Sequence, residues 1–155
     1  MLSEDIISCE NLVKIYKTKE LEVLALQGLE LQIAQGELMA IIGNSGSGKS
    51  TFLNMLGGLD RPTSGSVVVD GRDLSTLKDE ELTVFRRRKI GFVFQAYNLV
   101  PVLSVYENIV LPIQLDGGKV DGAYVDQVVQ ALGLEGKLDS LPNQLSGGQQ
   151  QRVAI

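Results

Sequence analysis

A single run of consecutive residues carries the chemistry that is easiest to recognise in this chain. It consists of Gly43, Asn44, Ser45, Gly46, Ser47, Gly48, Lys49, Ser50 and Thr51. Glycines leave no side chain between the backbone and an approaching anion, so successive N–H groups can converge on a polyphosphate. The lysine adds a positive charge for the phosphates, and the hydroxyl of Ser50 can bind Mg²⁺. The run predicts a nucleotide-phosphate site; the alternative is a flexible turn rich in glycine and serine.

The segments on either side of this run support the first interpretation. Residues 38–42 (LMAII) precede it and residues 52–56 (FLNML) follow it. A strand, a glycine-rich turn and a helix form the context in which the pattern G-x-x-x-x-G-K-[ST] binds phosphate. The start of the helix adds unpaired N–H groups and the positive end of its dipole. Because residues 38–42 are apolar throughout, we predict a parallel strand covered on both faces.

A second motif lies near the end of the chain, at Ser146, Gly147, Gly148 and Gln149. The pattern S-x-x-Q is a capping box and predicts a helix that begins here. Glycine in a first helical turn costs about 1 kcal/mol. Two such glycines are understandable if a ligand must approach this backbone closely, because a helix start with exposed N–H groups can bind phosphate. The alternative is an ordinary capped helix.

Hydrophobic periodicity predicts the remaining elements. Residues 6–33 alternate between apolar and polar, which predicts antiparallel strands with a turn at residues 18–20. The helix after the glycine-rich run should end near Gly57. Further predicted elements are a strand at 67–69 with a hairpin turn at 70–71, a helix at 75–88, a strand at 90–95, and helices at 104–114 and 120–132. Pro112 predicts a break or kink in the first of these last two helices.

Composition narrows the possible functions. The chain has 155 residues, a net charge of −5, one cysteine (Cys9) and no histidine. This length suits one domain, and Cys9 is expected to fill space on a strand. The acidic charge argues against nucleic acid as a partner, and the basic cluster at 86–89 is interpreted as a solvated helix end. No apolar stretch approaches the ~20 residues of a membrane helix, so a cytoplasmic protein is expected.

Three features in order resemble the nucleotide-binding subunit of ATP-binding cassette (ABC) transporters: the phosphate loop at 43–51, Gln95, and the motif at 145–149. The resemblance covers nearly the whole chain. It implies the α/β fold of a P-loop NTPase, with an N-terminal antiparallel β subdomain and a small α-helical subdomain. The implied divisions are 1–95 for the N-terminal part of the ATP-binding core, 96–145 for the helical subdomain, and 146–155 for the start of the signature helix.

The resemblance also implies roles for individual residues, with ATP and Mg²⁺ as cofactors. Tyr16 matches the aromatic residue that stacks on adenine, although alone it would be interpreted as a surface aromatic of a strand. Gln95 matches the glutamine that approaches Mg²⁺ and the attacking water, although alone it would be interpreted as structural. Lys49 and Gln95 are thus the catalytic candidates, and Ser50 and Gln95 the metal ligands. In a head-to-tail dimer, residues 146–149 would contact the γ-phosphate held by the other subunit.

Finer sequence detail is similar to one branch of this family, the cassettes for lipoprotein release and for macrolide or antimicrobial-peptide export. The matching segments are Asn44, 54–60, 85–95 and 106–109. The implied partners are a second copy of the subunit and a membrane permease, contacted through residues 96–105 at the inner face of the cell membrane. The alternatives are a soluble cassette ATPase without a permease, a different phosphate-loop enzyme such as a small-molecule kinase, and a fragment that only binds ATP.

The family further requires an aspartate for Mg²⁺, a glutamate for the attacking water and a histidine for the γ-phosphate, all after the signature helix. The sequence ends at Ile155 and contains no histidine. We therefore expect an N-terminal piece of a longer cassette, with the C-terminal part of the core absent. We also expect negligible ATP hydrolysis by this piece alone and unpaired edges in its sheet.

Overall fold

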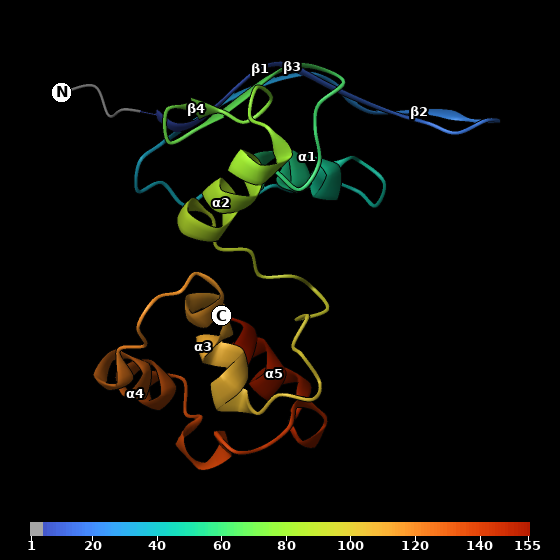
Figure 1. The fold of residues 1–155 in the computed structure, drawn as a ribbon. Coiled ribbons are helices and arrows are strands. Elements are labelled where there is room, and N and C mark those ends of the chain that lie inside the picture. The colour runs from blue at the N-terminus through green and yellow to red at the C-terminus, as the bar shows by residue number, and fades with distance from the viewer. Residues whose placement is uncertain (1–4) are drawn as a thin grey trace. The chain divides into compact units, whose positions relative to one another are not determined.

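The computed structural model describes residues 5–155, and the chain divides into two compact units (Figure 1). One unit extends to Ile90 and the other begins at Gly91. Each unit has its own cluster of buried apolar side chains. The two units are therefore described separately.

The first unit contains a four-stranded antiparallel sheet in the order β2-β1-β3-β4. The strands are β1 (Asp5–Lys17), β2 (Glu22–Ala34), β3 (Ser64–Val69) and β4 (Arg72–Asp73). The predicted antiparallel pair is confirmed, and its turn is closed by a hydrogen bond from the N–H of Thr18 to the carbonyl of Leu21 at 2.8 Å. The predicted short strand and the turn at Asp70 and Gly71 are confirmed as β3 and its connection to β4.

Two helices, α1 (Lys49–Leu56) and α2 (Asp79–Lys89), lie against one face of this sheet (Figure 1). Both present apolar side chains to it: Phe52 and Met55 from α1, and Leu82 and Phe85 from α2, all belong to the buried cluster. Cys9 on β1 belongs to the same cluster, as expected for a residue that fills space. Its burial raises the pKa of the thiol to about 11, because the thiolate would lose its hydration.

The predicted strands at 38–42 and 90–95 are wrong. Neither segment is a strand, and Gln95 lies in a turn. The apolar pattern of residues 38–42 favours burial, but Leu38 is 98% exposed and Ile42 is 90% exposed. A strand forms only where its N–H and C=O groups pair with a neighbouring strand, and no described residue pairs with either segment.

The second unit is helical, as predicted. It contains α3 (Val105–Leu115), α4 (Gly122–Ala131) and α5 (Gly147–Ala154), with the short 3₁₀ segments η1 (Glu135–Lys137) and η2 (Pro142–Gln144). Val110 of α3, Val129 of α4 and Val153 of α5 meet in its core. Of the break or kink predicted at Pro112, the break is wrong, because α3 continues through this residue to Leu115. Of the helices found among residues 5–155, none has both the length and the apolar character needed to cross a membrane.

Gly65 should be indispensable to the sheet. Its φ is +83°, and a Cβ there would overlap the carbonyl oxygen of Asn11 at the irregularity in the β1–β3 pairing. We expect Gly65→Ala to lower the free energy of unfolding by more than about 2 kcal/mol. The new alanine would have an unfavourable φ, and the neighbouring backbone would also have to move to make room for its Cβ.

Gly71→Ala is the matched control. Gly71 has a φ of +71°, but no atom lies within 4 Å of a Cβ placed there. Its substitution should cost only about 1 kcal/mol. Urea unfolding of the two variants and the wild type measures both values, and equal losses would contradict the steric explanation.

Candidate functional site

The glycine-rich run leads directly into α1. Gly48 is the N-cap residue, with a φ of 87°, and its carbonyl accepts the first helical hydrogen bond, from the N–H of Phe52 at 2.8 Å. A Cβ on Gly48 would overlap the carbonyl oxygen of Ala25 on β2, so the start of α1 touches the sheet backbone. No side chain caps α1 and its first turn carries no acidic residue. Its N-terminal N–H groups are therefore suited to an anion.

The ammonium of Lys49 folds back over the loop. Its Nζ donates to the carbonyls of Gly43 at 2.8 Å and Asn44 at 2.7 Å, and to the hydroxyl of Ser47 at 3.3 Å. The positive charge thus lies at the centre of the loop. Phosphate oxygens would be stronger acceptors for it than these neutral oxygens.

A pocket of about 640 Å³ joins the loop to the sheet. Residues 45–51 of the loop line it together with Tyr16 of β1 and Val23, Leu24 and Ala25 of β2. The structure therefore brings the predicted base-stacking residue to the predicted phosphate loop. One part of the pocket offers backbone N–H groups, the ammonium of Lys49 and the hydroxyl of Ser50, and the other offers an aromatic ring and aliphatic side chains. A nucleotide has the same division between phosphates and base.

Tyr16 contacts Lys14 and Asp60, two residues that were not predicted from the sequence to be part of the site. Its hydroxyl donates to Asp60 Oδ2 at 2.9 Å, and Lys14 Nζ lies 4.8 Å from the centroid of its ring. Lys14 also donates to Asp60 Oδ1 at 2.7 Å. Burial raises the pKa of Asp60, but hydrogen bonds from Lys14, Tyr16 and the Arg61 N–H, with the charge of Lys14, outweigh it, and the pKa lies below its ordinary value.

A signal for Lys14, but not for Asp60, did exist in the sequence. Lys14 and Tyr16 are two positions apart on a strand, which places them on the same face. Asp60 lies 44 residues from Tyr16, and only the folded structure brings the two together.

The predicted capping box at the start of α5 is confirmed. The N–H of Gln149 donates to the Ser146 hydroxyl at 3.3 Å, and the N–H of Ser146 donates to Gln149 Oε1 at 2.9 Å. Gly147 and Gly148 are exposed, and a Cβ on either would come no closer than 3.9 Å to another described atom. Packing within the second unit therefore does not require either glycine.

Gln95 and the start of α5 belong to the second unit, whereas Lys49 belongs to the first. Gln95 is exposed, in a turn followed by Tyr97 and Asn98 with φ values of 60° and 53°. Positive φ is uncommon for residues other than glycine. The turn thus has an unusual backbone.

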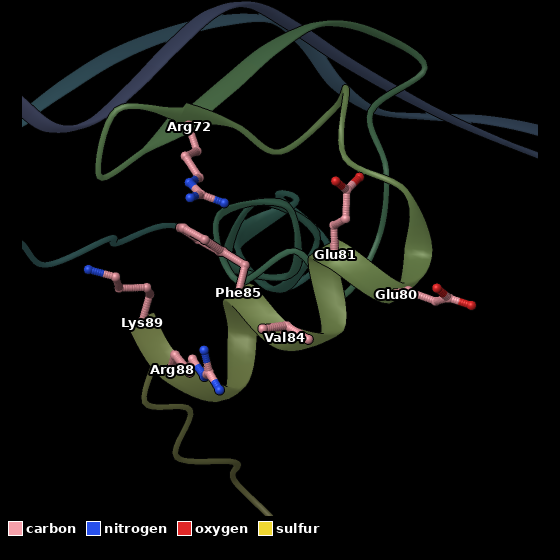
Figure 2. A pocket seen from close by; sticks show the side chains of 7 residues that line it. All are labelled: Arg72, Glu80, Glu81, Val84, Phe85, Arg88 and Lys89. Atoms are coloured by element: carbon pink, nitrogen blue, oxygen red, sulfur yellow. The ribbon is translucent and has the colours of Figure 1, made fainter. Parts of the chain in front are cut away.

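A second hollow of about 430 Å³ runs along α2 and has mixed charge (Figure 2). Glu80 and Glu81 line it toward the start of α2, and Arg88 and Lys89 toward its end. Lys89 is already paired with Asp70 at 2.8 Å. The hollow is therefore less suited to a polyphosphate than the pocket at the glycine-rich loop.

Comparison with known proteins gives a consistent result. The family model described as "ABC transporter" matches residues 26–155. The chain is 49% identical to an uncharacterized ABC transporter ATP-binding protein of Thermotoga maritima, over 92% of this chain and 62% of that protein. It is 45% identical to the macrolide export ATP-binding/permease protein MacB of Syntrophobacter fumaroxidans, over 97% of this chain and 22% of that protein.

It is also 45% identical to the methionine import ATP-binding protein MetN of Halalkalibacterium halodurans, over 96% of this chain and 44% of that protein. Among solved structures, it matches the dimeric ATP-binding cassette MJ0796 bound to ADP and Pi at a TM-score of 0.85 and 45% identity, over 96% of this chain and 66% of that one. The expected fold class is thereby confirmed. The chain spans less than two thirds of the length of these curated relatives.

The lowered pKa of Asp60 predicts a pH-dependent contribution to stability. A carboxyl whose pKa is lower in the folded state stabilises the fold above its unfolded pKa of about 3.9, and this contribution is lost as the pH falls through the folded value. We expect Asp60→Asn to lower the free energy of unfolding more at pH 6 than at pH 3. Urea unfolding of the wild type and the variant at both pH values measures this loss of unfolding free energy.

The Lys14→Met background provides the control, because Lys14 is one cause of the lowered pKa. In that background the effect of Asp60→Asn should depend less on pH. If Asp60→Asn lowered the free energy of unfolding equally at pH 6 and pH 3 in the wild-type background, the lowered pKa of Asp60 would be contradicted.

Proposed function

Since the chain belongs to the ABC transporter family, we propose that it binds Mg–ATP as the ATP-binding subunit of a membrane transporter. The observation that carries the proposal is the pocket in which Tyr16 and the loop residues 45–51 meet. Neither a bare glycine-rich turn nor a surface tyrosine would account for their common pocket.

In the proposed complex, the adenine stacks on Tyr16 and contacts the apolar side chains of Val23 and Leu24. The phosphates lie against the loop, where the N–H groups at the start of α1 donate to them. Lys49 exchanges its carbonyl acceptors for oxygens of the β- and γ-phosphates. The hydroxyl of Ser50 ligates Mg²⁺, which takes most of its other ligands from phosphate and water.

We propose that two copies associate head to tail around ATP. In such a dimer, Ser146, Gly147 and Gly148 at the start of α5 meet the γ-phosphate held by the loop of the other copy. The exposure of both glycines supports this contact. The similarity to the cassette MJ0796, whose structure is described as dimeric, supports the same association.

In the whole protein, ATP hydrolysis would follow from positioning rather than from covalent chemistry. Lys49 stabilises the charge on the transferred phosphoryl group, and Gln95 approaches Mg²⁺ and the attacking water. The domain organisation that we propose for the chain is a core part at 1–95, a helical subdomain at 96–145, and a signature helix that begins at 146.

The proposed partner in the membrane is a permease, contacted through residues 96–105, which would hold the subunit at the inner face of the cell membrane. The similarity to MacB, in which an ATP-binding and a permease function share one name, favours export or release of a substrate. The chain is equally similar, at 45% identity, to MetN, which is named for import. Export is therefore a separate and more specific proposal than ATP binding.

Lys49→Ala should weaken ATP binding. Loss of a charged donor to phosphate costs about 1.5–3 kcal/mol, so the dissociation constant of Mg–ATP should rise about 10- to 100-fold. Isothermal titration calorimetry measures it. Lys17→Ala is the matched control, because the ion pair of Lys17 with Glu22, at 3.1 Å, is exposed. Unchanged ATP affinity in Lys49→Ala would overturn the proposed binding mode.

Residues 1–155 alone should show steady-state phosphate release well below about 1 s⁻¹, even at saturating Mg–ATP. Placement of the water and the metal supplies most of the rate in phosphoryl transfer, and the proposed site assigns this placement to Ser50 and Gln95 alone. A coupled phosphate-release assay tests this, with Lys49→Ala as the background. Turnover near 1 s⁻¹ that Lys49→Ala abolishes would show that the machinery is complete within these residues.

A further inference from the structure

Tyr16, Lys14 and Asp60 form a closed triangle of contacts. The tyrosine hydroxyl and the lysine ammonium bind different oxygens of the Asp60 carboxylate, at 2.9 and 2.7 Å. The same ammonium lies 4.8 Å from the centroid of the tyrosine ring, within the range of a cation–π contact. Each of the three side chains is thus held by the other two.

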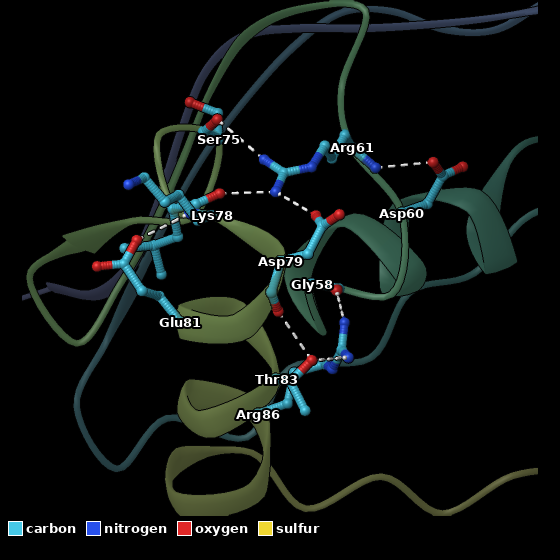
Figure 3. Close-up of polar contacts among 10 residues, drawn as sticks. Gly58, Asp60, Arg61, Ser75, Lys78, Asp79, Glu81, Thr83 and Arg86 are labelled. Carbon is cyan, nitrogen blue, oxygen red and sulfur yellow. Dashed lines mark hydrogen bonds and ion pairs between the residues drawn. The ribbon is translucent and has the colours of Figure 1, made fainter.

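Asp60 is itself attached to a rigid part of the first unit (Figure 3). Its neighbour Arg61 donates to the carbonyls of Ser75 at 3.2 Å and Leu77 at 2.6 Å, and binds the Asp79 carboxylate at 2.8 Å. Arg86 of α2 donates to the carbonyl of Gly58 at 2.6 Å. These bonds secure the segment after α1 on both sides of Asp60, so the carboxylate is a fixed point for Tyr16.

Lys14 and Asp60 contact Tyr16 outside the set of residues that line the nucleotide pocket. Tyr16 is among the residues that line that pocket, whereas Lys14 and Asp60 are not. The side chain of Lys14 is only 12% exposed, whereas Tyr16 as a whole is 39% exposed. With the ammonium over one face of the ring, the other face is the one available to a base.

We propose that Lys14 and Asp60 are positioning residues, which hold the Tyr16 ring in the orientation that stacks on the base of the nucleotide. The proposal rests on the proposed function of this pocket. A tyrosine at the exposed end of a strand would otherwise sample several rotamers, and binding would have to restrict them. The triangle imposes that restriction before the nucleotide binds, so it should strengthen binding of the base and leave binding of the phosphates unchanged.

The test compares two ligands, Mg–ATP and Mg–tripolyphosphate, because only the first has a base. Tyr16→Phe keeps the ring and removes its bond to Asp60, and Lys14→Met removes the ammonium and keeps the length of the side chain. In the full chain, each should weaken ATP binding about 3- to 10-fold and leave tripolyphosphate binding unchanged. Calorimetric titration gives both dissociation constants.

Two matched controls accompany these variants. Lys17→Met changes a lysine on the same strand, whose ion-pair partner is Glu22. Tyr124→Phe removes a hydroxyl from an exposed tyrosine of α4. Both should leave the affinities for ATP and tripolyphosphate as they are in the wild type.

The outcomes separate this proposal from the function on which it rests. Equal weakening of both ligands, or no weakening of either, would overturn the positioning role. Tyr16→Ala decides the function itself: if it does not weaken ATP relative to tripolyphosphate, the base does not stack here. If Tyr16→Ala is selective but Tyr16→Phe and Lys14→Met are not, only the positioning role fails. Should Lys14→Met not fold, Tyr16→Phe alone decides.

Discussion

The close approach of Gly48 to the backbone of β2 is the constraint on which the site depends. Because a Cβ at this position would overlap the carbonyl oxygen of Ala25, the start of α1 lies directly against the sheet. The loop and the hairpin of β1 and β2 consequently share one pocket, although Tyr16 and Lys49 are far apart in the sequence. A larger residue would separate the part of the pocket suited to phosphates from the part suited to a base.

The helix α1 connects both parts of the pocket. Its first residue is Lys49, and the segment that follows its last residue carries Asp60, which binds the hydroxyl of Tyr16. An eight-residue helix is about 12 Å long. The relative positions of the loop and of the Tyr16 ring therefore depend on one short helix, whose Phe52 and Met55 belong to the core.

Those parts of the fold and of the site that depend on local patterns could be predicted from the sequence. The hairpin, the loop that leads into α1, the helical second unit and the capping box at Ser146 all follow from residue types at fixed spacing. The segments 38–42 and 90–95 could not be assigned this way, since a strand depends on a partner that its own sequence does not specify. The contact of Asp60 with Tyr16 joins residues 44 positions apart, so no local pattern predicts it.

The burial of Cys9 has a practical consequence for spectroscopy. It is the sole thiol of the chain, and its pKa of about 11 leaves almost no thiolate at neutral pH. Maleimide dyes and thiol-reactive spin labels react with the thiolate, so Cys9 contributes little background labelling in the folded protein. A cysteine introduced at an exposed position can thus be labelled alone, without first removing the native one.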